Sequence, residues 1–333
     1  MPESVWRHWF DPARAFDEPA VVVIVGLLVG ALAVAPVGLR LLERRKPLDP
    51  ALRADLASRY WSWLVMVPVI VAPVLLGASW TIAAVGLLSI LSYREFARVT
   101  GLFRERVMSL VVVVGIALVT VAVADRWYGF FMALGPEVLI LIAAASTALD
   151  RPKGYLQRVS LAVFAFLLFG LGLGHLGYMA NEPRYRAVVL MLVFAVEMND
   201  VFAYASGKTL GGPKLAPATS PNKTISGSLG ALLLTTLTVY ALSGLIFREG
   251  PLSGPVQRVA LGMLISITGQ FGDLTLSSIK RDIGVKDTGS FIPGHGGVLD
   301  RANSLLFSAP AVFHYLNVFG AFSDAPPLHH LYR

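Results

Sequence analysis

The sequence predicts an all-α polytopic integral membrane protein, with its functional site at the cytoplasmic ends of the C-terminal helices. Three observations indicate this class. Of the 333 residues, 55% are hydrophobic and only 15% are charged, whereas a soluble domain has about 25% charged residues. The mean hydropathy is +0.66. The apolar residues also gather in runs of about 20, which is the length that a helix needs to cross a bilayer.

Followed in chain order, the apolar runs divide into ten candidate spans. Their approximate limits are 20–42, 61–77, 79–95, 106–124, 129–149, 157–179, 186–206, 228–247, 257–279 and 302–321. Only residues 77–79 separate the second span from the third. Two pairs of small residues, Gly26 with Gly30 and Gly170 with Gly174, predict close packing between helices.

The basic residues are distributed unevenly among the connecting loops. If every second loop is placed on one side, that side holds 20 of the 28 lysines and arginines and the other side holds 8. Because cytoplasmic loops are enriched in Lys and Arg, this bias predicts ten spans with both termini outside. The net charge of +7 is then explained by topology and anionic lipid, and we expect no nucleic acid partner. Residues 1–19 are net negative, so the first apolar run is expected to be a retained helix rather than a secretory signal.

We expect two regions in the chain. Residues 1–185 would form the N-terminal spans, the first six. Residues 186–333 would form a C-terminal catalytic region, with four spans and the cytoplasmic loops 207–227 and 280–301. These two loops are polar and rich in Gly and Pro, and they carry acids at the ends of spans. The chain has no cysteine, which excludes disulfides, thiolate zinc sites and Cys nucleophiles.

The first of these loops follows an acidic residue at the end of an apolar run. Asp200 is expected to face a polar cavity, because an acid within a span is costly elsewhere. Ser220, Lys223 and Thr224 offer hydroxyl, ammonium and backbone donors of the kind that bind phosphate. Composition alone does not distinguish a phosphate-binding loop from an ordinary solvated one.

The second loop and the helix ends around it carry the strongest pattern. Asp273 and Ser277 are four residues apart and therefore share a helix face, which Lys280 extends. Asp300 begins the last span. Two carboxylates from neighbouring span ends can bind Mg²⁺, which prefers oxygen ligands and keeps substrate phosphates in its coordination shell.

Cations and other polar residues alternate between these carboxylates. Lys280, Arg281, Lys286 and Arg301 could neutralise phosphates, although positive-inside topology would by itself account for them. That topology does not account for the interleaved residues Asp287 and His295, or for the two carboxylates.

This stretch resembles the motif of the phosphatidate cytidylyltransferase (CDP-diacylglycerol synthase) family. The family motif reads Ser-x-x-Lys-Arg, four residues, Lys-Asp, a short gap, His-Gly-Gly, and Asp-Arg-x-Asp-Ser. The residues that match it in register are Ser277, Lys280, Arg281, Lys286, Asp287, Pro293, His295, Gly296, Gly297, Asp300, Arg301 and Ser304. The loop from Asp200 to Gly227 resembles the family's other recurring block, so that the specific resemblance covers roughly residues 195–310.

The resemblance implies a nucleotidyltransferase that makes CDP-diacylglycerol and pyrophosphate from CTP and phosphatidic acid at the cytoplasmic face of a membrane. We expect the inner or plasma membrane of a bacterium, because the chain is compact and shows no organelle-targeting segment. The resemblance also implies that Asp273 and Asp300 coordinate Mg²⁺, and it leaves open a second cation such as K⁺ and a homodimer. The implied catalytic residues are Asp273, Lys280, Arg281, Asp287, His295, Asp300 and Arg301. The implied substrate-binding residues are Asp200, Ser220, Lys223, Thr224, Ser277 and Lys286.

Three positions depart from the family pattern, because Ser226, Leu276 and Asn303 stand where the family usually has acids. The departures keep two alternatives open: a CTP-dependent transferase for another lipid phosphate, such as a polyprenyl one, and a catalytically weak or silent membrane paralogue. A lipid or ion transporter is disfavoured, because its acids would lie near the membrane midplane rather than at span ends.

Overall fold

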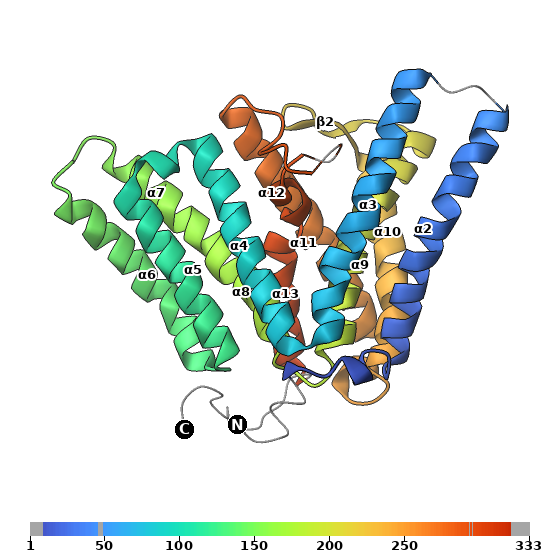
Figure 1. Cartoon of the computed structure of the whole chain (residues 1–333), viewed down its shortest axis with the longest axis horizontal. Helices are drawn as coiled ribbons and strands as arrows, with labels where there is room; N and C mark the ends of the chain where they lie inside the picture. Colours follow the sequence, from blue (N-terminus) through green and yellow to red (C-terminus); the bar gives the residue numbers. More distant parts are fainter. Residues whose placement is uncertain (1–8, 46–48, 293, 295, 321–333) are drawn as a thin grey trace.

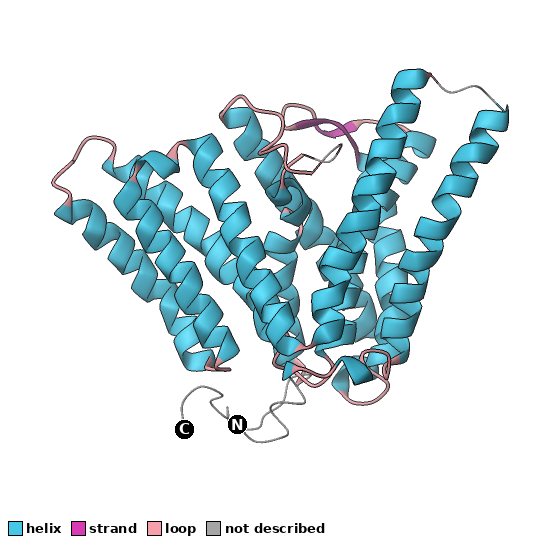
Figure 2. Ribbon diagram, in the orientation of Figure 1, coloured by secondary structure: helices cyan, strands magenta, loops and turns pink. Residues whose placement is uncertain are grey.

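The computed structural model describes residues 9–45, 49–292, 294 and 296–320, and this part of the chain is almost wholly helical (Figure 1, Figure 2). The first six long elements are α2 (Pro19–Arg45), α3 (Pro50–Leu76), α4 (Ala78–Thr100), α5 (Arg106–Ala124), α6 (Tyr128–Ala148) and α7 (Tyr155–Ala165). A π-helical segment, η3 (Phe166–Gly172), joins α7 to α8 (Leu173–Met179). The remaining helices are α9 (Tyr185–Leu210), α10 (Ile225–Ile246), α11 (Pro255–Asp282), α12 (Val298–Ala302) and α13 (Leu305–Val318). Short 3-10 turns lie at η1 (Pro12–Arg14), η2 (Leu102–Arg104) and η4 (Pro251–Ser253).

Eight helices in the described ranges are long and apolar enough to cross a membrane. They are α2, α3, α5, α6, the continuous segment Tyr155–Met179, α9, α10 and α11. Large apolar side chains such as Val34, Val69 and Ile140 are well exposed on these helices, as expected where lipid rather than water surrounds them. The chain is therefore an all-α polytopic integral membrane protein. These eight helices coincide with eight of the ten expected spans, and the number of spans stays a prediction.

The other two expected spans form helices that differ from a simple span. Helix α4 is 23 residues long, but Arg94, Glu95 and Arg98 in its second half shorten its apolar stretch. The expected span 302–321 is interrupted after Ala302, the last residue of α12, and its remainder is α13, which has only 14 residues. The division lies at Asn303, whose side-chain Oδ1 accepts the Ser304 N–H at 2.7 Å.

The expected break between the second and third spans lies at Gly77. This residue has φ of +144°, and a Cβ there would lie 2.1 Å from the Trp9 carbonyl oxygen. Only glycine allows that backbone conformation and close approach. The helix that carries the second expected span, 61–77, begins earlier, at Pro50, where Asp49 accepts the Ala51 N–H at 3.2 Å as an N-cap.

The helices splay apart toward one end of the molecule, where the small hairpin lies (Figure 1). The α4–α5, α6–α7, α9–α10 and α11–α12 connections lie at this end. The α3–α4, α5–α6, α8–α9 and α10–α11 connections lie at the other end, as do the first residue of α2 and the last of α13. The basic loops thus gather at one end, as the alternation predicted, and we call this the basic end.

Helix α8 is buried throughout, and the first half of α9, up to Asn199, is mostly buried beside it. Helix α10 packs against α9 and α11, and α13 packs against α11 and α8. Helices of the first region also contact the second, since α2 packs on α9 and α4 packs on α12. The division of the chain near residue 185 remains a prediction.

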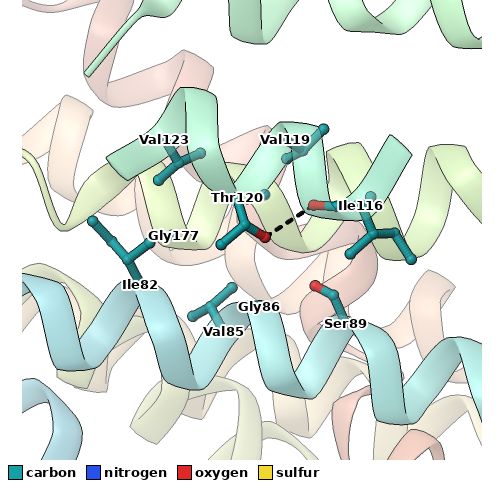
Figure 3. A pocket seen from close by; sticks show the side chains of 11 residues that line it. Ile82, Val85, Gly86, Ser89, Ile116, Val119, Thr120, Val123 and Gly177 are labelled. Atoms are coloured by element: carbon teal, nitrogen blue, oxygen red, sulfur yellow. Dashed lines mark hydrogen bonds between the residues drawn. The ribbon is translucent and has the colours of Figure 1, made fainter. Parts of the chain in front are cut away.

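Small residues leave a narrow cavity of about 10 Å³ between α4, α5 and the η3–α8 segment (Figure 3). Gly86 and Gly177 line it together with Val85, Ile116 and Val119. Such a volume is about that of a single water-sized sphere, so this is a packing defect rather than a substrate site.

The predicted close packing between helices is confirmed at Gly174, where a Cβ would lie 2.7 Å from the Val119 side chain of α5. At Gly170 a Cβ would meet Phe166 at 2.7 Å, but that residue belongs to the same segment, so this contact does not join two helices. The same prediction was wrong for Gly26 and Gly30, because no atom of another described segment lies within 4 Å of a Cβ built at either residue. The spacing of small residues alone therefore did not identify a helix contact.

Candidate active site

The site forms at the basic end, where α9, α10, α11 and α12 converge. The antiparallel strands β1 (Lys214–Ala216) and β2 (Ser220–Thr224) form a hairpin that leads from α9 into α10. Thr224 ends the hairpin and caps α10, since its hydroxyl accepts the Gly227 N–H at 3.1 Å. Lys223, one residue earlier, is thereby fixed beside Asp273 of α11.

Asp273 on α11 is held from two other elements. Its Oδ2 forms an ion pair with the Lys223 ammonium of β2. Its Oδ1 accepts a hydrogen bond from the Asn303 amide at 2.7 Å. The α11 and α12–α13 backbones can approach closely here because Gly272 has no side chain: a Cβ on it would lie 2.5 Å from the Asn303 carbonyl oxygen.

Asp300 on α12 is the most completely coordinated carboxylate of the site. Its Oδ1 pairs with the Lys280 ammonium of α11 at 2.8 Å. Its Oδ2 accepts the N–H groups of Thr288 at 2.9 Å and Gly297 at 3.0 Å, and the Thr288 hydroxyl lies 3.0 Å away. Burial, which leaves the side chain 5% exposed, would raise the pKa of this carboxyl. The Lys280 ammonium and the two backbone N–H groups outweigh burial and hold the pKa below its ordinary value.

A third carboxylate, Glu95 of α4, supports Asp300 from outside the C-terminal region. Its Oε1 accepts the Val298 N–H at 3.0 Å, and its Oε2 accepts the Leu299 N–H at 2.8 Å. These are the first two N–H groups of α12, which begin a helix without intrahelical acceptors. Gly297 at the N-cap has no side chain to accept them, so Glu95 takes that role. A Cβ on Gly297 would lie 2.3 Å from Glu95 Oε2, so glycine is needed for this contact.

Sequence reasoning missed Glu95. It stands between arginines near the end of an expected span, about 200 residues from its partners, and nothing in its local pattern separates it from the solvated end of a helix. The available signal was indirect: a helix start with Gly at the N-cap leaves N–H groups that need an acceptor.

Asp200 lies on the Asp273 side of the site. Its side chain, on α9, is exposed and interacts electrostatically with Asp273, Lys223 and Arg301. Arg301 on α12 also faces Glu197 of α9, and its Nε is buried without a hydrogen-bond partner among the described residues. The structure therefore brings together the predicted residues Asp200, Lys223, Asp273 and Arg301, as well as Lys280 with Asp300.

Other predicted residues are placed less centrally. Arg281 donates from Nε to the Thr219 carbonyl oxygen at 3.3 Å and so ties α11 to the hairpin. Asp287 is exposed and lies close to Gly296, against which Asp300 also lies. Lys286 is exposed, and Ser277 and Ser220 are half-buried. Within the described part of the chain, the side chains of these three residues form no hydrogen bond or ion pair. His295 and Pro293 lie outside the described residues.

The three departures from the family pattern have structural counterparts. Asn303 donates to Asp273, which a carboxylate could not do. The Ser226 hydroxyl donates to the Gly211 carbonyl oxygen and closes the base of the hairpin. Leu276 is 2% exposed and packs in the apolar core. Each replacement is therefore accommodated locally, and Asp273 and Asp300 remain in place.

The family of the chain follows from comparison with known proteins. A model of the cytidylyltransferase family matches residues 57–319, which include all the described residues of this site. The chain belongs to the cytidylyltransferase family. Over 309 residues it is 31% identical to "Uncharacterized protein YnbB" of Escherichia coli (strain K12), a match that covers 90% of this chain and 98% of that protein.

Curated cytidylyltransferases match over shorter stretches. The phosphatidate cytidylyltransferase of Brucella abortus biovar 1 (strain 9-941) is 40% identical over 146 residues, which cover 44% of this chain and 51% of that protein. The phosphatidate cytidylyltransferase of Bacillus subtilis (strain 168) is 29% identical over 223 residues, or 64% of this chain and 81% of that protein. The chain thus spans about half the length of the Brucella relative. The resemblance inferred from the motif is confirmed at the level of the family.

Proposed function

We propose that this protein transfers the cytidylyl group of CTP to phosphatidic acid and releases CDP-diacylglycerol and pyrophosphate. The observation that carries the proposal is the pairing of two carboxylates with two lysines, Asp273 with Lys223 and Asp300 with Lys280, at one end of a membrane bundle. Such a site offers both acids for a divalent cation and cations for phosphate. Family membership and the two curated relatives support cytidylyl transfer as its chemistry.

The reaction requires one bond to form and one to break. A phosphate oxygen of the lipid attacks the α-phosphorus of CTP, and the bond from that phosphorus to the bridging oxygen breaks. Pyrophosphate leaves with the electron pair. The protein needs to align the two substrates and to neutralise the charge on the triphosphate, which together supply most of the catalysis in reactions of this class.

The described residues divide this work between two sides of the site. On the hairpin side, Lys223 and Ser220 would contact CTP, with Arg281 holding the hairpin against α11. On the α12 side, Lys280 and Arg301 would contact the phosphates. Thr224, whose hydroxyl already caps α10, would act mainly through the backbone that it fixes.

The other predicted residues complete the proposed site. Asp200 would assist through its charge, and Ser277, Lys286 and Asp287 would line its edge. The role of His295, shaping of the loop or proton handling, stays an open prediction.

The chemistry of the donors fits Mg²⁺. Within the described ranges no group of three or more His, Asp or Glu side chains could hold a metal alone. Mg²⁺ is ordinarily held by one or two carboxylates, with water and substrate phosphates completing its shell, so Asp273 and Asp300 would suffice. When bound, the cation would neutralise part of the charge of the triphosphate. Lys223 and Lys280 balance the same carboxylates without it.

The proposal includes an orientation and a membrane. The gathering of basic loops supports a cytoplasmic basic end, where CTP is available, in the inner or plasma membrane of a bacterium. The lipid chains would lie between helices, with the phosphate at the level of α12. A homodimer and a second cation such as K⁺ remain parts of the proposal that the described residues do not address.

A second substrate is kept as the alternative by one specific observation. Asn303, which donates to the proposed metal ligand Asp273, stands where the family usually has an acid. The change at this position supports a CTP-dependent transferase for another lipid phosphate, such as a polyprenyl phosphate, as the alternative.

The test is a transfer assay with the purified full-length chain in nanodiscs, with Mg²⁺ and CTP labelled in the cytosine. Phosphatidic acid and a polyprenyl phosphate would be supplied separately. We expect labelled CDP-diacylglycerol from phosphatidic acid, and no product with Asp273→Asn or Asp300→Asn. Asp282→Asn, at the exposed end of α11, is the matched control and should retain activity. Product from polyprenyl phosphate alone would select the alternative, and no product from folded protein with either lipid would select the silent paralogue.

A further inference from the structure

A large groove lies outside the site, between α4 and α5 and next to η2. Its volume is about 880 Å³, which is within the range of ligand sites of small molecules. Three arginines line it: Arg94 and Arg98, one turn apart on α4, and Arg104 of η2. All three side chains are exposed.

The positive charge of this groove is uncompensated by the protein. Among the residues that the structure describes, none of the three guanidinium groups has an ion-pair partner. The acids nearest to them in sequence are engaged elsewhere: Glu95 accepts hydrogen bonds from the start of α12, and Glu105 lies 4.0 Å from Arg158. Arginine forks of this kind bind phosphate oxygens in pairs.

The rest of the groove is lined by apolar side chains together with Tyr93 and Ser109. Ile90 and Val113 form its wall between α4 and α5, and the Phe103 ring lies beside the Arg104 guanidinium, 5.6 Å from it. The α4–α5 connection lies at the basic end (Figure 1), and apolar helix surface continues from the groove along α5, where Leu110 and Val114 are exposed. Phosphate-binding groups thus lie above a surface that acyl chains could cover.

We propose that this groove binds the headgroup of an anionic membrane phospholipid, with its phosphate between Arg94, Arg98 and Arg104 and an acyl chain along Ile90 and Val113. Positive-inside topology would explain arginines at this level of the bundle, but it requires neither a groove nor acids turned away from it. The proposal concerns a face of α4 other than the one that carries Glu95, and it does not depend on the transfer reaction.

The test uses the purified full-length chain in phosphatidylcholine nanodiscs that contain a photoactivatable phosphatidylglycerol. This probe is a phosphodiester, so it is not the proposed substrate. Labelled peptides are mapped by mass spectrometry. We expect labels in α4 and α5, and a loss of labelling of about thirtyfold in the double variant Arg94→Gln/Arg98→Gln, from the typical contribution of each arginine near an anionic lipid. Arg40→Gln/Arg44→Gln removes the same charge from α2 at the basic end and should keep the α4–α5 label.

Two further arms make the result decisive. Val113→Trp keeps all three arginines but fills the apolar wall, and should also reduce labelling if acyl chains lie there. Inorganic phosphate at millimolar concentration should not displace the label. Equal labelling in the arginine double variant and its control would overturn the proposal. Displacement by inorganic phosphate, with no effect of Val113→Trp, would also overturn it in favour of a site for free phosphate.

Discussion

Glu95 Oε2 accepts a hydrogen bond from the backbone N–H of Leu299 at 2.8 Å, although the two residues are 204 positions apart. Through this bond and its partner at Val298, a helix of the N-terminal region fixes the first turn of α12. That turn carries Asp300 as its third residue. Thr288 reinforces the link, since its hydroxyl lies 3.2 Å from Glu95 and 3.0 Å from Asp300. Glu95 is therefore a positioning residue for the proposed metal ligand.

The variant Glu95→Gln tests this role. Glutamine keeps one acceptor oxygen but loses the charge that favours the start of a helix, so we expect the free energy of unfolding to fall by about 1 kcal/mol. We also expect kcat to fall by about tenfold, because small displacements of catalytic groups are costly. Transfer kinetics and thermal unfolding measure the two effects. Glu249→Gln, exposed at the opposite end of the bundle, is the control. A destabilised variant with wild-type kcat would show that Glu95 acts on folding alone.

The sequence predicted those parts of the site that lie within one helix or one loop. Asp273, Ser277 and Lys280 share α11, as their spacing required, and the break at Gly77 was visible as a short interruption between apolar runs. The Glu95 contact joins segments with no shared pattern, so it required the packed structure. The division of the last expected span at Asn303 also depends on a side chain competing for a backbone N–H, which hydropathy does not detect.

The hairpin lysines provide a second prediction. Lys223 pairs with Asp273, whereas Lys214 on the neighbouring strand is exposed and has no ion-pair partner among the described residues. We expect Lys223→Gln to raise KM for CTP by about tenfold or more, because a charge-assisted contact to phosphate is lost. Lys214→Gln should leave KM for CTP within about twofold of the wild-type value, because no charge-assisted hydrogen bond is lost at this position. Equal effects of the two changes would mean that the hairpin contributes only general positive charge.

Asn303 provides a third prediction, through the amide that it donates to Asp273. Asn303→Asp replaces this donor with a second carboxylate, so the two like charges should repel in the absence of a cation. In EDTA, we expect the variant to unfold at a lower temperature than the wild type does. With Mg²⁺, we expect the variant to reach half-maximal activity at a lower Mg²⁺ concentration than the wild type. Asn317→Asp, exposed near the end of α13, is the control. If Asn303→Asp needs as much Mg²⁺ as the wild type, position 303 lies outside the metal site.

Gly272 provides a fourth prediction that concerns packing. A methyl group there would lie 2.5 Å from the Asn303 carbonyl oxygen, whereas one at Gly26 meets no atom within 4 Å. Gly272→Ala must therefore push α11 away from the α12–α13 junction, and we expect a loss of about 1–3 kcal/mol in unfolding free energy together with a loss of transfer activity. Gly26→Ala should be neutral or slightly stabilising, because it favours the helix. Wild-type stability and activity of Gly272→Ala would show that the two segments are farther apart than described.

The pair of Lys280 and Asp300 provides a prediction with a defined pH dependence. Burial raises the pKa of the Asp300 carboxyl. Lys280 and the backbone donors lower this pKa by more than burial raises it, so the pKa in the folded protein is below its ordinary value. Such a group stabilises the fold above the unfolded pKa of about 4, and this contribution is lost as the pH falls through the folded pKa.

The variant Lys280→Met tests this contribution. It removes the ammonium partner that lies 2.8 Å from Asp300, which should lower the free energy of unfolding by about 2 kcal/mol at neutral pH. The difference in unfolding temperature from the wild type should therefore be largest at neutral pH and should shrink as the pH is lowered below about 4. Lys153→Met, in the exposed α6–α7 loop, should show no such trend. A difference that stays constant with pH would mean that Lys280 stabilises the fold by packing rather than by its charge.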